Sequence, residues 1–386
     1  MKNFSADIQL IIECCQASPS TNKIKKLLSC INDWDNFINL AYAHGVFPLL
    51  YQTLKHTDYK NLINEDIHTT MKLHYMNIVK ENMLMTVELI KVIKLLEENG
   101  IEVIAFKGPT LAQMAYGDIT LRQYADLDIL VDEKMMQKIY NILIQNNYTS
   151  DNKLILLNNS NFYLLENDFI FYSPNKSVTI EIHWRLFRKN IAKHQKFSYY
   201  RNNTKNIILN KNNILTLSIE QELSYLCLHG AKHAWERIEW INDIYYLINN
   251  NSDIIKWSQV IHHSKELEGT IALFVALNII KSLYSIKIPK HIETNMNSAY
   301  INKLTDESIH LIQNHVNDSY VGYYKTIKFQ SKLIENRFKR LQYIFTSYFA
   351  ITRNDYIAFP LPSYLNLLYY IVKPIRIFYK ILKNKK

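Results

Sequence analysis

Two stretches in the middle of the chain decide the fold: Ile104-Ala105-Phe106-Lys107-Gly108-Pro109-Thr110 and Asp126-Leu127-Asp128-Ile129-Leu130-Val131. Each contains a short apolar run with β-branched residues. Such runs predict strands over residues 101–106 and 126–131. The segment 107–109 combines glycine and proline, so it is expected to end the first strand in a turn.

The segments that follow these stretches predict further mixed structure. Short helices are expected over residues 110–116 and 133–145. Two more apolar runs, at 168–172 and 177–184, flank a turn signal that contains proline and asparagine, and they predict a hairpin. The middle of the chain is therefore expected to be mixed α and β.

The flanking regions are expected to be helical. Apolar residues at helical spacing predict helices over 33–44, 47–56 and 66–99. Ser218, with Gln221 three residues later, fits a capping box and predicts the start of another helix. Helices are expected to continue from there toward the C-terminus.

The expected fold class is α+β, in three parts. We expect an N-terminal helical region over 1–99, a mixed core over 100–214, and a C-terminal helical domain with a basic tail over 215–386. Asparagine-rich stretches at 202–213 and 249–253 are expected to be loops.

Composition narrows the class of protein. The chain has 386 residues, of which 48% are hydrophobic, and this fraction excludes a fully disordered chain. Seven glycines and eight prolines are too few for a turn-rich sandwich or barrel. A net charge of +10 is compatible with a nucleic acid, a nucleotide or an anionic surface as partner, and it selects none of them.

Cysteine usage and the apolar runs predict a cytoplasmic protein without a transmembrane segment. The four cysteines contain no CxxC pair with zinc spacing, which favours a reduced compartment. The first ten residues lack the apolar region of a secretory signal. The longest apolar run, near 270–280, is too short to span a bilayer.

Three acidic residues carry the strongest chemical signal. Asp126 and Asp128 are two positions apart in an expected strand, so both carboxylates lie on one face. Two like charges held close repel each other unless a cation lies between them, and carboxylates are ligands of Mg²⁺. Glu181 alternates with Ile180 and Ile182 and provides a third carboxylate. We predict that Asp126, Asp128 and Glu181 are the catalytic residues and the ligands of two Mg²⁺ ions, for which Mn²⁺ could substitute.

A phosphate-binding loop is expected beside these acids. Gly108, between a strand and a helix, allows backbone N–H groups to approach a phosphate. Thr110 could add a hydroxyl and Lys107 a positive charge, and we expect the Lys107 side chain to be exposed at the end of its strand. Arg122 could bind phosphate or brace the acidic pair. These four residues are the predicted nucleotide-binding set.

The ordered set of KGPT, Arg122, DLDIL and IEIH resembles the polymerase-β-type nucleotidyltransferase superfamily. It is most similar to an uncharacterised bacterial nucleotidyltransferase family that pairs a KGxxL segment with RxxxDLDILV. The resemblance implies a nucleotidyltransferase core with a small mixed sheet. Two departures stand out. Pro109 replaces a loop residue that has an N–H, and Glu181 stands where aspartate is commoner.

The implied activity is transfer of a nucleoside monophosphate from a nucleoside triphosphate, such as ATP, to an acceptor hydroxyl with release of pyrophosphate. Glu181 would anchor the metal on the acceptor side and could take the proton of the hydroxyl. The acceptor could be an RNA, a small molecule or a protein side chain. Two rival interpretations stay open: a catalytically silent nucleotide-binding or interaction protein on the same fold, and a basic nucleic-acid-binding protein.

A second group of residues lies after Ser218. If the chain is helical from 229 to 243, one stripe carries His229, His233, Trp240 and Asp243. With His183, this stripe could line a cleft for the nucleotide or the acceptor. It could equally be a structural face, and His229 with His233 could bind zinc, although no third ligand is evident.

The C-terminal tail, residues 364–386, mixes apolar and aromatic residues with lysine and arginine. Packing on the domain with a basic end is one interpretation, and peripheral contact with a membrane surface is the other.

Overall fold

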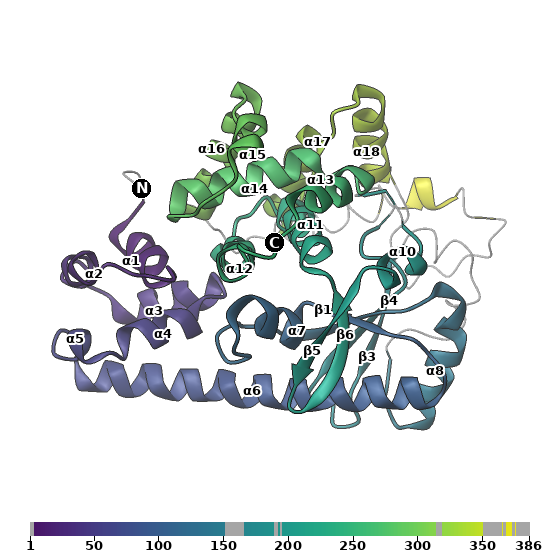
Figure 1. Cartoon of the computed structure of the whole chain (residues 1–386), viewed down its shortest axis with the longest axis horizontal. Coiled ribbons are helices and arrows are strands. Elements are labelled where there is room, and N and C mark those ends of the chain that lie inside the picture. The colour runs from purple at the N-terminus through teal and green to yellow at the C-terminus, as the bar shows by residue number, and fades with distance from the viewer. Residues whose placement is uncertain are drawn as a thin grey trace.

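The structure is a computed structural model that describes residues 4–150, 166–188, 192–193, 195–313, 319–349, 365, 368–372 and 375. Its centre is a six-stranded mixed sheet in the order β3-β4-β2-β1-β6-β5. The strands are β1 (Ile104–Phe106), β2 (Asp126–Leu130), β3 (Asp168–Tyr172), β4 (Thr179–His183), β5 (Thr204–Leu209) and β6 (Asn212–Leu217). Helices cover both faces of the sheet (Figure 1), so the predicted α+β class is confirmed.

Strand pairing joins segments that lie far apart in the sequence. β1 is antiparallel to β2 and parallel to β6, while β2 is parallel to β4. The predicted hairpin is confirmed as the antiparallel pair of β3 and β4. The two acid-bearing strands, β2 and β4, are therefore direct neighbours at the centre of the sheet.

The prediction of a loop over 202–213 was wrong. This segment contains β5 and the first two residues of β6, and the two strands form an antiparallel hairpin. In β5 the buried Ile207 and Leu209 alternate with the exposed Asn206 and Ile208. The two-residue connection Asn210-Lys211 has φ values of 44° and 64°. Positive φ at both residues is the geometry of a type I′ hairpin turn, which asparagine tolerates.

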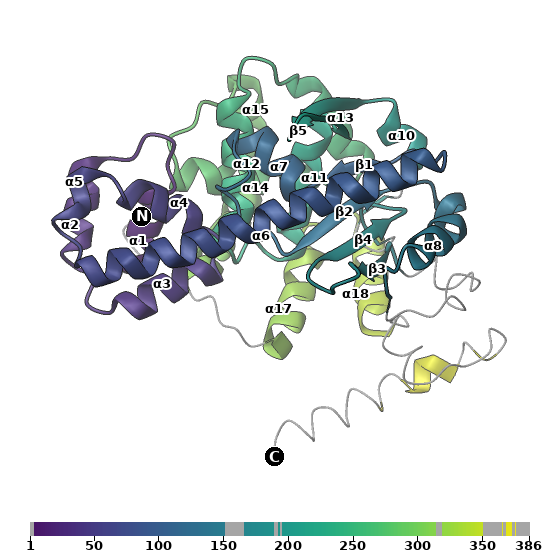
Figure 2. The same cartoon turned by 90° about the horizontal axis from the view of Figure 1, so that it is seen from below.

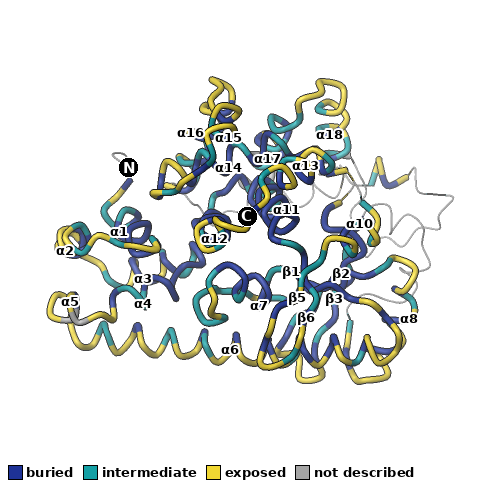
Figure 3. Tube along the Cα trace, in the orientation of Figure 1, coloured by how far each residue is buried: buried dark blue, intermediate teal, exposed yellow. Residues whose placement is uncertain are grey.

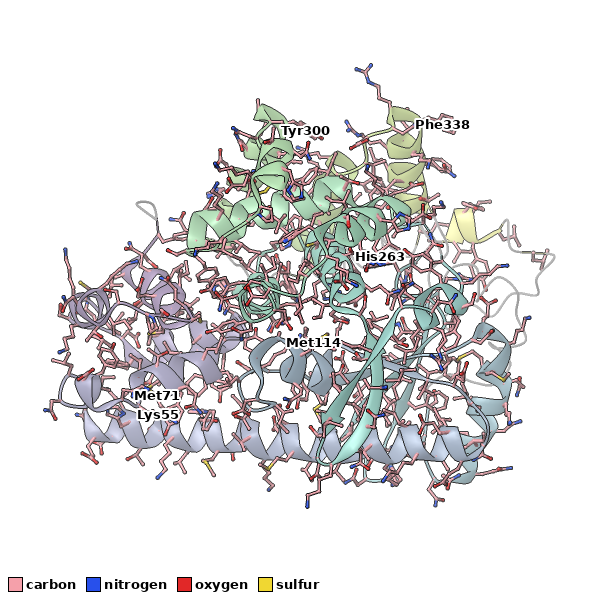
Figure 4. The ribbon with its side chains drawn as sticks, viewed as in Figure 1. Lys55, Met71, Met114, His263, Tyr300 and Phe338 are labelled. Atoms are coloured by element: carbon pink, nitrogen blue, oxygen red, sulfur yellow. The ribbon has the colours of Figure 1, made fainter. Side chains whose placement is uncertain are left out.

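Helices precede the sheet, as predicted. They are α1 (Ala6–Cys14), α2 (Thr21–Leu28), α3 (Trp34–Ala43), α4 (Phe47–Leu54), α5 (Thr57–Lys60) and α6 (Glu65–Glu98). α6 is a 34-residue helix that extends beneath the N-terminal helices and the sheet alike (Figures 1 and 2). Met71, labelled in Figure 4, is fully buried on the side of α6 that meets the N-terminal helices. α6 thus joins the N-terminal region to the core.

The remaining helices alternate with the strands and then follow them. They are α7 (Gly108–Leu111), a π-helical turn (Ala112–Tyr116), a 3₁₀ turn (Glu133–Met135), α8 (Met136–Gln145), α10 (Phe197–Arg201), α11 (Ile219–Lys232), α12 (Ile238–Asn250), α13 (Trp257–Glu266), α14 (Thr270–Leu283), α15 (Lys290–Met296), α16 (Ala299–Gln313), α17 (Ser319–Lys332) and α18 (Arg337–Phe349). The predicted capping box of Ser218 and Gln221 is present at the start of α11. Within the described part of the chain, no helix has the length and apolar character needed to cross a membrane.

Two apolar cores lie on opposite faces of the sheet. The face formed by Leu127, Ile129, Ile180 and Ile182 packs against α6 and α8 in one core. The other core contains the N-terminal helices and the C-terminal helices around α11, α12 and α14. The three-part division stays a prediction. Its second boundary, at residue 214, falls inside β6.

Most of the C-terminal tail, including all of its basic residues, lies outside the described residues.

Candidate functional site

Strand register brings the predicted acidic residues to one face of the sheet. Asp128 on β2 lies opposite Glu181 on β4 and opposite Phe106 on β1. Because alternate residues share a face, Asp126 lies beside Asp128, and His183 lies beside Glu181. This polar face is turned toward α11, away from the core formed with α6 and α8.

His183 lies between the two carboxylates. Its Nε2 is 3.0 Å from Oδ1 of Asp128 and 3.2 Å from Oε2 of Glu181. Its Nδ1 is 3.2 Å from the side-chain nitrogen of Asn167, and Phe106 packs edge-on against the ring. His183 therefore belongs to the acidic group itself rather than to a separate cleft.

Charges within this group shift its pKa values in opposite directions. Burial opposes a charge on His183, but hydrogen bonds to Asp128 and Glu181 outweigh burial and raise the pKa of His183 to about 10. Burial also opposes a charge on Asp128, but Lys107 and His183 lower its pKa to about 2. Burial opposes a charge on Glu181, but the hydrogen bond and the charge of His183, together with the charge of Lys107, outweigh burial and lower its pKa. The structure thus stabilises Asp128 and Glu181 as carboxylates and His183 as a cation.

Asp126 differs from the other two acids. Burial raises its pKa to about 6, and the neighbouring charge of Asp128 adds to this effect. One ligand atom each from Asp128, Glu181 and His183 lie within 4.8 Å of one another, and Asp126 is not part of that group. Asp126, Asp128 and Glu181 therefore share one face of the sheet, but the close group on that face consists of Asp128, Glu181 and His183.

The donor set fits a divalent cation. Asp128 Oδ2 is buried and forms no hydrogen bond within the described structure. A buried carboxylate oxygen without a partner is unfavourable, and a hard cation would satisfy it. The carboxylates of Asp126, Asp128 and Glu181 offer the oxygen ligands that such an ion prefers.

The Lys107-Gly108 loop is strained and lies against the acids. Lys107 has φ 51° and ψ −150°, which is rare for a residue with a side chain, and Gly108 has φ 40°. The positive φ of Gly108 would strain any residue with a side chain there, and a Cβ atom would lie in contact with the backbone oxygen of Asp126, at 3.4 Å. The strain is typical of a loop whose backbone must approach a ligand.

The expectation that Lys107 is exposed was wrong. Its ammonium lies 3.4 Å from Asp128 Oδ1 and 5.4 Å from the centre of the Tyr225 ring, and its side chain is 15% exposed. Burial opposes its charge, but Asp128, Tyr225 and Asp126 together outweigh burial and raise the pKa of Lys107. The strained backbone turns this side chain inward, where it pairs with the acidic group.

Two other predicted phosphate ligands have partners within the protein. Thr110 is fully buried, and its hydroxyl donates to the carbonyl oxygen of Lys107 at 2.7 Å. Arg122 donates two hydrogen bonds to Asp243, at 2.9 and 3.0 Å, and Tyr116 donates a third. Arg122 therefore binds a buried carboxylate of α12 instead of bracing Asp126 and Asp128.

The stripe from His229 to Asp243 is not one helix. α11 ends at Lys232 and α12 begins at Ile238, and between them Ala234 and Trp235 have φ values of 53° and 49°. Two consecutive residues with positive φ interrupt helical hydrogen bonding. Asp243 consequently lies with Arg122, apart from the histidines.

The aromatic members of the stripe still meet, across the break between the helices. His233 stacks on Trp240 with ring centres 4.6 Å apart, and His229 lies 5.1 Å from His233. Tyr225 stacks on His229 in turn, and Tyr225 also contacts Lys107. A wall of stacked rings thus extends from the acidic group along α11 to α12. We call Tyr225, His229, His233 and Trp240 the aromatic wall.

Sequence reasoning missed two charged residues of α11. Lys232 lies near Lys107, Arg188 and Glu181, and burial together with the two basic neighbours lowers its pKa. The described structure shows no ion pair for its ammonium. Glu222 is fully buried, and burial raises its pKa to about 8 although the backbone and the charge of Lys107 oppose this rise. Glu222, Tyr225, His229 and Lys232 recur every three or four residues of a largely apolar helix. This polar stripe is a sequence signal that could have identified Glu222 and Lys232.

Comparisons with known proteins identify the family of this chain. Residues 32–285 match a family described as an uncharacterised nucleotidyltransferase. No curated protein matches the chain. A solved structure, an antigenic nucleotidyltransferase-like protein from Paracoccidioides brasiliensis, is similar at 14% identity with a TM-score of 0.33, over 52% of this chain and 88% of that chain. The similarity to that structure is too low to support an argument about the site. Since the family match covers well over half of the chain, this protein belongs to the uncharacterised nucleotidyltransferase family.

Proposed function

We propose that this protein is a metal-dependent nucleotidyltransferase of the polymerase-β type. It would transfer a nucleoside monophosphate from a nucleoside triphosphate to an acceptor hydroxyl. The observation that supports this most is the buried meeting of Asp128 and Glu181 with Lys107 beside them, in a member of a nucleotidyltransferase family. Asp128 Oδ2, which has no hydrogen-bond partner among the described residues, leaves a ligand position free in that group.

Two lysines are suited to hold the triphosphate. Lys232 lies near the acidic group and its ammonium forms no ion pair in the described structure. An incoming phosphate could therefore bind this ammonium without displacing a carboxylate from it. Lys107 is paired with Asp128 and could exchange this carboxylate for a phosphate oxygen at little electrostatic cost. The backbone at Gly108, at the start of α7, would lie beside the same phosphates.

We propose that the site binds two Mg²⁺ ions, for which Mn²⁺ could substitute. These ions would supply positive charge that acidifies the acceptor hydroxyl and neutralises the pyrophosphate. Asp126, Asp128 and Glu181 would hold them. Their positions on the adjacent strands β2 and β4 keep the carboxylates together before any ligand binds. This preorganisation reduces the reorganisation needed in the transition state.

The reaction forms a bond between the acceptor oxygen and the α-phosphorus. The bond from the α-phosphorus to the oxygen bridging to the β-phosphorus breaks, and pyrophosphate leaves with its electron pair. The proton of the acceptor hydroxyl passes to a carboxylate, for which we propose Glu181. The side chain of Glu181 is 24% exposed, whereas that of Asp128 is fully buried, so Glu181 is the more accessible of the two to an acceptor.

The aromatic wall could hold the base of the nucleotide or the acceptor. Burial lowers the pKa of His229, and it lowers that of His233 to about 3, so both rings are neutral at pH 7. Neutral rings stack on a base or a sugar face without adding charge. The acceptor itself could be an RNA, a small molecule or a protein side chain.

One observation favours a second candidate, a catalytically silent nucleotide-binding protein on the same fold. Lys107 and His183 already neutralise Asp128 within the protein, so the fold does not require a metal for charge balance. In this alternative the lysines bind a nucleotide and no transfer follows.

Labelled triphosphates separate the two candidates. The purified protein with Mg²⁺ and cell extract should move label from an α-labelled triphosphate to an acceptor fraction, and should not do so from a γ-labelled one. Asp128→Asn should abolish the transfer, while Asp58→Asn, at an exposed position, should not change it. If no triphosphate labels any fraction above background with Mg²⁺ or Mn²⁺, the transferase proposal fails and the silent candidate is favoured.

A further inference from the structure

The outer side of α6 carries large apolar side chains that no described residue covers. Leu73, Met76, Met83, Leu84 and Val87 are each between 51% and 63% exposed. Figure 3 shows α6 exposed along the lower edge of the molecule. Contiguous exposed apolar side chains of this size usually mark an interaction surface.

Four of these residues, Leu73, Met76, Leu84 and Val87, belong to one stripe of the helix that has charges at both ends. Its members recur at three or four residues, so they lie on one side. We call them the outer stripe: Asp66, Thr69, Leu73, Met76, Lys80, Leu84, Val87, Lys91 and Lys94. Every one of them is exposed. The opposite side of α6 is buried through Ile78, Met85, Leu89 and others.

The outer stripe is symmetric about Lys80. Leu73 and Val87 are equally distant from Lys80, and so are Met76 and Leu84. In an antiparallel pair of identical helices centred at Lys80, residues at equal distances on either side face each other. Leu73 of one copy would then face Val87 of the other, and Met76 would face Leu84. Their apolar surfaces would be removed from water over about 21 Å of helix.

The charges of the outer stripe match the same arrangement. Asp66 and Lys94 are also equally distant from Lys80, so an antiparallel pair places an acid opposite a base at both ends. Neither side chain forms an ion pair with another described residue. A parallel pair would instead place Asp66 against Asp66 and Lys94 against Lys94, which like-charge repulsion disfavours.

We propose that α6 forms a two-fold symmetric homodimer interface, in which the outer stripes of two copies pack antiparallel about Lys80. The two Lys80 side chains meet at the symmetry axis. Their apolar stems can lie along the interface while the ammonium groups extend into water. The active-site face of the sheet, on the far side of α6, stays open in this dimer.

Concentration-dependent sedimentation velocity tests the interface. The wild-type chain should be dimeric, and Met76→Glu with Leu84→Glu should raise the dissociation constant by about a hundredfold or more, because each substitution occurs twice. Ile208→Glu, at a 62% exposed position of β5, is the matched control and should leave the dimer unchanged. Circular dichroism and thermal melting establish that each variant is folded. A monomeric wild type at about 0.1 mM, or a dimer that survives the double substitution, would overturn the proposal.

Cross-linking tests the orientation. Cys30 is exposed and the other cysteines are buried, so a Cys30→Ser background removes the accessible thiol. On oxidation, Leu73→Cys with Val87→Cys should form a disulfide-linked dimer, and Leu73→Cys alone should not. A linked dimer from Leu73→Cys alone would indicate parallel helices and would overturn the antiparallel arrangement.

Charge reversal is an independent test of the same arrangement. Asp66→Lys should weaken the dimer severalfold, because Lys94 of the other copy then meets a like charge. Adding Lys94→Asp in the same chain should restore it. Failure of the second substitution to restore the dimer would contradict the pairing of Asp66 with Lys94.

Discussion

The two faces of the central sheet are built from the same strands and have opposite properties. On β2 and β4, Leu127 and Ile180 are fully buried against α6 and α8. Two-residue alternation places Asp128 and Glu181 of the same strands on the other face, near Lys107. The apolar face stabilises the fold, whereas the polar face holds like charges close together, which is unfavourable without partners. Such a concentration of buried charge on a stable platform is typical of a functional site.

The largest effect is expected when one charge is removed from the polar face of the sheet. Asp128→Asn keeps the size of the side chain but removes a carboxylate that contacts both Lys107 and His183. We expect nucleotidyl transfer to fall by about a thousandfold or more, because metal binding and charge stabilisation each contribute several kcal/mol. Rates of pyrophosphate release measure this. Folding should persist in thermal melting, and a variant with near wild-type rates would remove Asp128 from the mechanism.

A substitution on the apolar face of the sheet should lower the free energy of unfolding. Ile129 is fully buried in the core between the sheet and α6. Ile129→Ala should lower the free energy of unfolding by about 2–5 kcal/mol, from lost burial and the cavity that remains. Urea denaturation measures the change, and Ile208→Ala, at an exposed position, should cost less than about 0.5 kcal/mol. Equal effects of the two substitutions would contradict the assignment of this face as a core.

A smaller effect is expected at the edge of the polar face. Lys232 lies near the acidic group without an ion pair in the described structure, and we propose that it binds the triphosphate. Lys232→Ala should weaken triphosphate binding about tenfold to a hundredfold, and Lys232→Arg should weaken it less, since the charge is kept. Calorimetric titration measures the affinity. Lys265→Ala, on the exposed side of α13, is the control, and unchanged affinity in Lys232→Ala would exclude a phosphate contact.

The smallest expected effect is the dependence of protein stability on pH that Glu222 causes. Burial raises the pKa of Glu222 to about 8, while the carboxyl of an unfolded chain titrates near 4.5. Between these values the folded protein holds a proton that the unfolded chain has lost. The contribution of Glu222 to the free energy of unfolding must therefore fall as the pH rises from about 4.5 to about 8.

Glu222→Gln, which cannot ionise, should remove this contribution. The variant should become more stable than the wild type as the pH rises from 5 to 8, and the two should converge near pH 4.5. Urea denaturation across this range measures the difference, with Glu335→Gln, at an exposed position, as the control. A constant difference between variant and wild type would show that Glu222 does not titrate in this window.

Local sequence patterns predicted the elements and the faces of the strands well. Alternation in β2 and β4 correctly placed Asp126, Asp128 and Glu181 on one face, because side-chain direction in a strand depends only on position along it. The predicted helices over 33–44 and 66–99 are each followed by a glycine, Gly45 and Gly100, with φ of 70°, a conformation that glycine adopts readily at the end of a helix. The hairpin of β5 and β6 was missed because asparagine is common in both loops and hairpin turns.

Contacts between distant segments were decided only by the tertiary structure. The pairing of Arg122 with Asp243 and the approach of Lys232 to the acidic group join residues more than fifty positions apart. No local pattern specifies them, since the choice among charged partners depends on how α11 and α12 pack over the sheet. The inward turn of Lys107 likewise depends on a strained backbone that the surrounding packing holds in place. The sequence by itself determined that Asp126, Asp128 and Glu181 lie on one face of two strands. Only the packing of the helices over the sheet decided which charged side chains lie near these acids, because electrostatic attraction depends on distance in space.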